Sequence, residues 1–193
     1  PGWGVMAVPG RSIQRRPSPS FRAEASTTSG FVSLEAEQPS RMSGGEGADW
    51  KVISGLGRSG DSIGLFPTNL KVPARAALEY DFTVGQTGPV KVLIYCLPTQ
   101  PIHPGVKARY SVSMDSGAAI MVDIATAEYS KSWSTNVLRA AAIGVTDQML
   151  DRSGQHTLKL QPLDPGLVFD KIVLDLGGLK PTHLGPPETH AMP

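Results

Sequence analysis

The sequence predicts an all-β fold, an antiparallel β-sandwich of the jelly-roll type, over residues 30–178. One observation is a hydrophobic pattern of period two that returns in segment after segment, as expected where successive side chains point to opposite faces of a strand. The other is turn chemistry between these segments, at residues 115–117 (Asp-Ser-Gly) and 164–166 (Asp-Pro-Gly). No helix-sized amphipathic segment alternates with the strands, as a parallel sheet would require.

The strands follow from this pattern in chain order. In residues 76–84, for example, Leu78, Tyr80 and Phe82 share one face, and acidic and polar side chains occupy the other. Strands are expected at residues 31–37, 76–84, 108–115, 118–124, 156–161 and 167–174.

Two segments are harder to assign. Residues 136–143 have good intrinsic helix propensity but lie among strands, so the residues alone allow either structure. Residues 146–151 are expected to form a single helical turn, with Thr146 as its N-cap.

The two ends of the chain have the composition of connecting segments. Residues 1–29 contain four prolines and four arginines with no acidic residue before Glu24, which indicates a linker. Residues 179–193 are rich in proline and glycine, and they are expected to form an extended tail over the surface.

Composition excludes several classes of function. Apolar residues make up 40% of the chain and charged residues 18%, which is typical of a chain that folds. A net charge of +1 is too small for a nucleic-acid partner, and no apolar run approaches the roughly 18 residues that span a membrane. The single Cys96 excludes an intramolecular disulfide, and its apolar neighbours indicate an inert core thiol.

Enzyme motifs are weak or absent. Residues 55–60 match the G-x-G-x-x-G dinucleotide pattern, but they lead into an alternating segment instead of a helix, so a tight turn is expected. The sequence contains no nucleophile elbow, Walker loop or zinc-protease helix. His156 lies on the apolar face of its strand, which favours a core histidine over a catalytic base.

Two glutamates stand out on the first expected strand. Glu35 and Glu37 lie side by side on its polar face, about 6.6–6.8 Å apart, where they repel each other unless a positive charge lies between them. They are solvated surface charges, a calcium site or, least favoured, a general acid–base pair. First and last strands are commonly neighbours in such sandwiches, so Asp170 is the expected third carboxylate of a calcium site.

Aromatic residues suggest a binding surface. Trp50 and Trp133 lie near strand ends, where an indole either plugs the core or offers a platform to a sugar ring. Tyr129, Trp133 and Asn136 would together combine an aromatic face with an amide for hydroxyl groups.

Several segments together resemble the C-terminal domain of family 115 glycoside hydrolases, the xylan α-1,2-glucuronidases. They run in order over about residues 30–188 and include 31–37, 50–60, 78–82, 109–115 and 154–160. The most specific is G-G-L-K-P-T-H-L-G-P-P-E at residues 177–188. Family members more often have Ser-Tyr in place of Thr182-His183, which here costs an aromatic ring.

The resemblance implies a sandwich similar to carbohydrate-binding modules of families 6 and 35, including their Glu-Ala-Glu calcium motif, and a strand at residues 136–143. The family's catalytic residues belong to upstream domains, so the chain is expected to be a non-catalytic accessory domain of an extracellular or periplasmic enzyme.

Two functions follow from the resemblance. One is a module that binds glucuronoxylan, with Trp133 or Trp50 on a xylose ring, Asn136 on hydroxyls and Arg58 on a uronic carboxylate. Arg58 is preferred to the arginines of the linker because its glycine-rich turn holds it on the folded domain. The other is a structural domain that packs on the catalytic body or forms a homodimer and binds no sugar itself.

Overall fold

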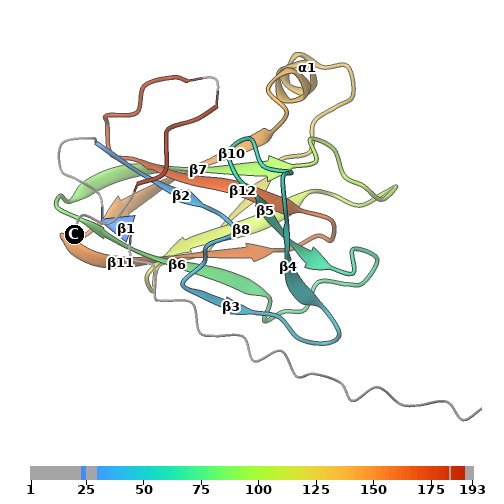
Figure 1. Ribbon diagram of the computed structural model, residues 1–193, viewed down its shortest axis with the longest axis horizontal. Coiled ribbons are helices and arrows are strands. Elements are labelled where there is room, and N and C mark those ends of the chain that lie inside the picture. Colours follow the sequence, from blue (N-terminus) through green and yellow to red (C-terminus); the bar gives the residue numbers. More distant parts are fainter. Residues whose placement is uncertain (1–22, 25–29, 183, 190–193) are drawn as a thin grey trace, which may run out of the picture.

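The alternating segments form two facing sheets in the computed structural model, which describes residues 23–24, 30–182 and 184–189 (Figure 1). The first sheet contains β1 (Ala23–Glu24), β3 (Arg41–Ser43), β6 (Ala77–Val84), β8 (Arg109–Met114), β9 (Ile120–Asp123) and β11 (Gly154–Pro162). The second contains β2 (Phe31–Glu35), β4 (Asp49–Ile53), β5 (Ser62–Phe66), β7 (Gly88–Leu97), β10 (Ala142–Leu150) and β12 (Val168–Asp175). Most of the expected linker, residues 1–22 and 25–29, lies outside the described residues.

The pairing confirms the predicted antiparallel sandwich. The first sheet has the order β1-β6-β11-β8-β9, with β3 also on β6, and the second has the order β10-β7-β12-β5-β4, with β2 also on β12. Every pair of strands is antiparallel except the short contact between β1 and β6. The alternating apolar side chains of both sheets meet in one core. Cys96 lies in that core, where burial raises the pKa of its thiol.

The helix α1 (Lys131–Leu138) corrects the strand expected at residues 136–143. Ser130 starts the helix, because its side chain accepts a hydrogen bond from the backbone N–H of Trp133 at 3.1 Å. Ala140 then adopts a positive φ of 54°, and β10 begins only at Ala142. α1 stands out from the edge of the sandwich (Figure 1). Within the described ranges, the helical structure includes no apolar segment of the length that a membrane span needs.

The helical turn expected at residues 146–151 is also wrong. Residues 146–150 belong to β10, where Thr146 lies opposite Val92 of β7. Thr146 and Leu150 are buried by this pairing, so burial and the hydrogen bonds of the sheet override the local capping signal.

The C-terminal segment returns across the outer face of the second sheet, as the dark red trace in Figure 1. The Ser33 N–H donates to Thr189 Oγ1 at 2.9 Å, and the Thr189 N–H donates to the Ser33 carbonyl at 2.8 Å. The Pro186 carbonyl accepts from Ser33 Oγ at 3.3 Å and from Lys171 Nζ at 3.1 Å. This segment explains why β2 is buried on both faces.

Candidate functional site

The acidic residues expected to bind calcium lie on neighbouring strands. β2 pairs with β12 in a register that places Glu35 opposite Lys171, one residue from Asp170. Glu37 lies two residues beyond Glu35, and its carboxyl interacts electrostatically with that of Glu35. The expectation that the first sandwich strand and the last strand are neighbours is therefore met.

The glycine-rich turn at residues 55–60 covers these carboxylates. Ser59 Oγ donates to Glu35 Oε1 at 3.1 Å, and the Arg58 N–H donates to Asp170 Oδ1 at 3.0 Å. A Cβ on Gly57 would lie 2.6 Å from Asp170 Oδ1 and 2.7 Å from the carbonyl oxygen of Asp61. Glycine is required by this close approach, so the G-x-G-x-x-G match has a structural cause and no nucleotide is needed to explain it.

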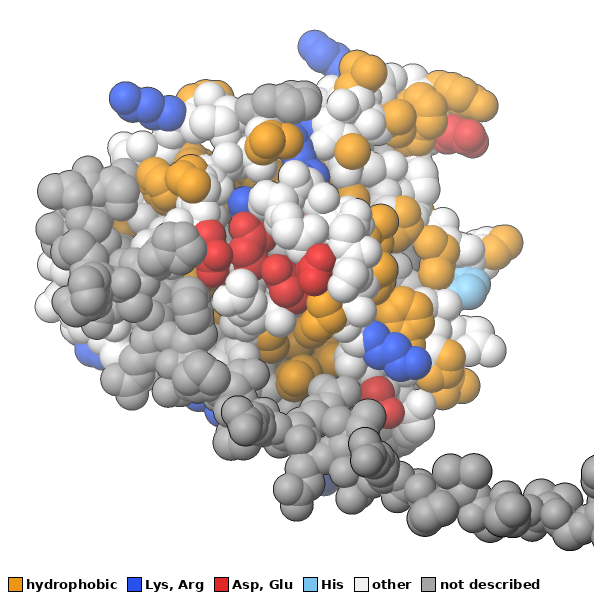
Figure 2. Space-filling view, in the orientation of Figure 1, with side chains coloured by type: hydrophobic (Ala, Val, Ile, Leu, Met, Phe, Trp, Pro, Cys, Tyr) orange, Lys and Arg blue, Asp and Glu red, His pale blue; other side chains and the backbone are white. Residues whose placement is uncertain are grey.

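Burial leaves these acidic groups short of partners. Desolvation raises the pKa of Glu37 to about 7 and that of Asp170 to about 6. Glu37 Oε2 and Asp170 Oδ2 are buried without a hydrogen-bond partner among the residues that the structure describes. Lys171, itself buried, compensates Glu35 through a contact of 3.1 Å between Nζ and Oε1. Figure 2 shows acidic side chains gathered near the centre of one face.

The donor types fit calcium, which takes 6–8 oxygen ligands from carboxylates and backbone carbonyls. The carbonyls of Gly60 and Asp61 lie in the same turn as the contact with Asp170. Within the described residues, however, no three acidic, histidine or cysteine side chains stand close enough together to hold an ion. To coordinate a calcium ion together, these carboxylates would have to rotate toward one another. Glu37 Oε2 and Asp170 Oδ2 can turn without breaking a hydrogen bond, because neither has a partner among the described residues.

A second group of candidate residues meets at α1. The exposed ring of Tyr129 lies 5.2 Å from the ring of Trp133 between centroids, with 58° between the planes. Asn136, one turn further along the helix, is buried, and its Oδ1 accepts from Arg139 Nη2 at 2.6 Å. Tyr129, Trp133 and Asn136 thus lie in and just before one helix. The side-chain oxygen of Asn136 is already bonded to Arg139.

A cavity of about 410 Å³ lies beside this segment, between β9, α1 and β10. Its polar lining consists of Asp123, Thr126, Ser132, Asn136 and Arg139.

One hydroxyl group in the cavity lining is unsatisfied. Thr126 Oγ1 is buried without a hydrogen-bond partner among the described residues. The Tyr110 hydroxyl, which lies against Gly144 of the cavity wall, also has none there, but Tyr110 belongs to the core and does not line the cavity. A cavity of this size with unsatisfied polar groups is typical of a small-ligand site, and sugar hydroxyls both donate and accept hydrogen bonds.

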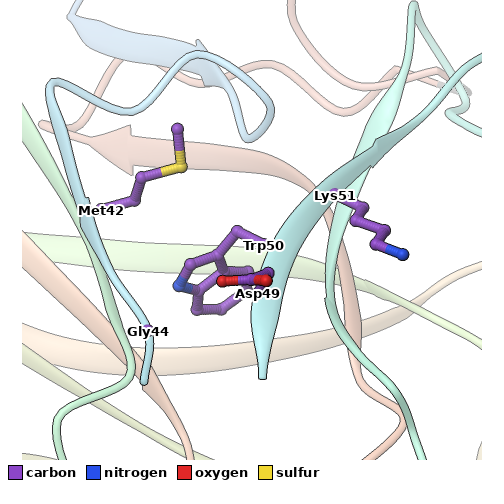
Figure 3. A pocket seen from close by; sticks show the side chains of 5 residues that line it. All are labelled: Met42, Gly44, Asp49, Trp50 and Lys51. Atoms are coloured by element: carbon purple, nitrogen blue, oxygen red, sulfur yellow. The ribbon is translucent and has the colours of Figure 1, made fainter. Parts of the chain in front are cut away.

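Trp50 lies elsewhere, in β4 (Figure 1). It is 7% exposed, its Nε1 donates to the Ser43 carbonyl at 2.8 Å, and its ring packs 6.4 Å from that of Phe169. A pocket of about 430 Å³ borders it, lined also by Met42, Gly44, Asp49 and Lys51 (Figure 3). Of the two options left by the sequence, this position is that of a core plug, with little ring face for stacking.

Arg58 lies on the outer face of the second sheet, with its guanidinium carbon 5.8 Å from the centroid of the Tyr95 ring. Arg139 is close enough that burial and the Arg58 charge lower its pKa. Sequence reasoning missed both Tyr95 and Arg139. The signal for Arg139 was its position three residues after Asn136, which places the two side chains together only on a helix.

Comparison with known proteins identifies the family and the fold of the chain. The model of the glycosyl hydrolase family 115 C-terminal domain matches residues 26–188. A solved family GH115 4-O-methyl-α-glucuronidase, with specificity for decorated arabinogalactans, is 26% identical with a TM-score of 0.60. That match covers 74% of this chain and 17% of the enzyme, so the chain corresponds to a small part of such a protein.

Two solved carbohydrate-binding modules share the fold. A family 35 module from Clostridium thermocellum is 16% identical with a TM-score of 0.51, and the match covers 74% of this chain and 97% of the module. A family 6 module is 13% identical with a TM-score of 0.50, covering 82% of this chain and 98% of the module. None of the curated proteins matches the chain.

Proposed function

We propose, from the premise that this chain belongs to the family of glycosyl hydrolase family 115 C-terminal domains, that it binds glucuronoxylan and holds its enzyme near that polysaccharide. The domain is a non-catalytic accessory part of a family 115 enzyme, with the fold of carbohydrate-binding modules. The observation that carries the proposal is the cavity beside α1. Thr126, whose hydroxyl has no hydrogen-bond partner among the described residues, lines this cavity together with Ser132 and Asn136 of α1. The exposed Tyr129 and the half-buried Trp133 form an aromatic pair in the same segment.

Each residue of the site has a role in this proposal. Trp133, with Tyr129 beside it, stacks on a xylose ring, because the apolar face of a sugar packs well on an indole. Asn136 and Thr126 serve sugar hydroxyls inside the cavity, and Arg58 binds the uronic carboxylate. Trp50 is the less suitable platform because it is buried.

Calcium is the proposed structural ion, held by Glu35, Glu37 and Asp170. Its charge would compensate the buried carboxylates, including the orphaned oxygens of Glu37 and Asp170. An extracellular or periplasmic location is proposed with it, because enzymes that act on plant polysaccharides meet their substrates there.

A specific observation favours the alternative, an interface domain. Trp133 and Val137 lie four residues apart on α1, the Tyr129 ring packs on Trp133 from just before the helix, and Leu138 is 83% exposed. Such an apolar stripe also suits contact with a catalytic domain or a second copy of the chain.

Retention on insoluble xylan, with cellulose and starch as comparison, tests the proposal. The chain is expected to sediment with xylan, and Trp133→Ala to weaken retention about tenfold or more, because an aromatic anchor carries a large share of binding energy. Val137→Ala, on the same helix, is the matched control and is expected to bind as the parent does. Failure of the parent chain to bind xylan at millimolar sugar would favour the interface function instead.

A further inference from the structure

Two neighbouring arginines, Arg58 and Arg139, differ from the arginines of the domain that form ion pairs. Arg41, Arg109 and Arg152 each lie within 3.3 Å of an aspartate or glutamate oxygen. Within the described part of the chain, neither Arg58 nor Arg139 has such an ion pair, although the two lie close together.

Neutral acceptors hold Arg139 in place. Its Nε donates to the Ala141 carbonyl at 2.8 Å, and its Nη2 donates to Asn136 Oδ1 at 2.6 Å. A guanidinium has five N–H donors, so three of them have no partner among the described residues. The position of the group is therefore fixed and most of its hydrogen-bonding capacity is available.

The guanidinium of Arg58 packs against the aromatic ring of Tyr95. The Arg58 side chain lies over Tyr95, and the charges of Arg58 and Arg139 both act on the Tyr95 hydroxyl. Asp170 interacts electrostatically with Arg58, but its Oδ1 accepts from the backbone N–H of Arg58 and its side chain is buried. No described carboxylate thus lies between the two guanidinium groups.

We infer that Arg58, which lies over the Tyr95 ring, and Arg139, which is bonded to Ala141 of the same buried cluster as Tyr95, form a binding site for the carboxylate of an acidic sugar. Two neighbouring guanidinium groups repel each other, and a bound anion removes that repulsion while taking up the unused donors. Arg139 also lines the cavity beside α1, so a uronic acid whose ring enters that cavity reaches the same guanidinium with its carboxylate. The inference rests on the proposed function and deepens it, since it adds Arg139 and Tyr95 and makes the negative charge of the ligand the basis of selectivity.

Calorimetric titration with D-glucuronate, D-glucose and inorganic sulfate tests this site. Glucuronate is expected to bind at least tenfold more tightly than glucose, which has the ring but no charge, and more tightly than sulfate, which has the charge but no ring. Arg58→Gln and Arg139→Gln are each expected to weaken glucuronate binding about tenfold, because hydrogen bonds to charged groups are strong. Arg75→Gln, at an exposed arginine remote from Tyr95, is the matched control and is expected to bind as the parent does.

Three outcomes would overturn the inference: equal affinity for glucose and glucuronate, sulfate binding as tight as glucuronate, or no effect of either substitution. If Arg139→Gln unfolds because it loses the bonds to Ala141 and Asn136, Arg58→Gln decides, since the Arg58 side chain makes no hydrogen bond in the described residues. A chain that sediments with xylan yet shows no preference for glucuronate keeps the proposed function and loses the arginine site.

Discussion

Replacing Lys171 by alanine is expected to lower the free energy of unfolding by about 3–5 kcal/mol, because it leaves a buried carboxylate without its counter-ion. Lys171 is 2% exposed and Glu35 is 8% exposed, and the Pro186 carbonyl of the C-terminal segment accepts a hydrogen bond from Lys171 Nζ. Urea unfolding in the presence of a chelator measures this loss without a contribution from added metal.

Lys91→Ala is the matched control. The Lys91 ammonium lies 2.7 Å from Asp147, but both side chains are exposed, so little change is expected. The double variant Glu35→Gln with Lys171→Met removes both charges and is expected to recover most of the lost stability. A loss at Lys171 no larger than that at Lys91 would contradict the buried pair.

Calcium is expected to raise the melting temperature, and a chelator to lower it again. An ion that binds only the folded chain stabilises it by about 2.7 kcal/mol at a concentration 100-fold above its Kd. The double variant Glu35→Ala with Glu37→Ala is expected to lose this response, whereas Asp147→Asn at the exposed pair is expected to keep it. An unchanged response in the double variant would exclude the proposed ligands.

The carboxyl groups of Glu37 and Asp170 are expected to make the stability of the folded chain depend on pH. Their pKa values are about 7 for Glu37 and about 6 for Asp170, above the ordinary 4.5 and 3.8, so the folded chain holds these protons more tightly than the unfolded chain. Their contribution to stability is therefore complete below pH 4 and is lost as the pH rises through about 7. Calcium binds the ionised groups, so its stabilising effect is expected to grow over this window. Melting temperatures from pH 4 to 8 measure the loss of stability without calcium and the growing effect of calcium when it is added. Glu37→Gln is expected to weaken the pH dependence that is seen without calcium.

The sandwich could be predicted from the sequence because each strand carries its own signal. Leu78, Tyr80 and Phe82 alternate with polar residues, and all three are buried in the core. The helix α1 could not be predicted in this way, because intrinsic propensity allowed either structure and the cap at Ser130 is one hydrogen bond. The resemblance favoured the strand and was wrong here.

The sites were predictable in part. The sequence indicated that Glu35 and Glu37 lie close together, although β2 ends at Glu35 and Glu37 lies in the turn that follows instead of on the strand expected to reach residue 37. Strand order added Asp170. The position of Lys171 depends on an irregularity in β12, where the register against β7 shifts between Phe169 and Lys171, and no sequence pattern indicates that shift. Tyr95 and Arg58 are also far apart in the chain, and only the packing of the sheet with the glycine-rich turn brings them together.

Titration of the isotope-labelled chain with xylo-oligosaccharides, plain or substituted with glucuronic acid, tests most directly whether the domain binds acidic xylan beside α1. The substituted ligand is expected to shift the NMR signals of the Trp133 indole N–H and the Asn136 side-chain amide at lower concentration than the plain one. The absence of any shift with either ligand at millimolar concentration would contradict the account.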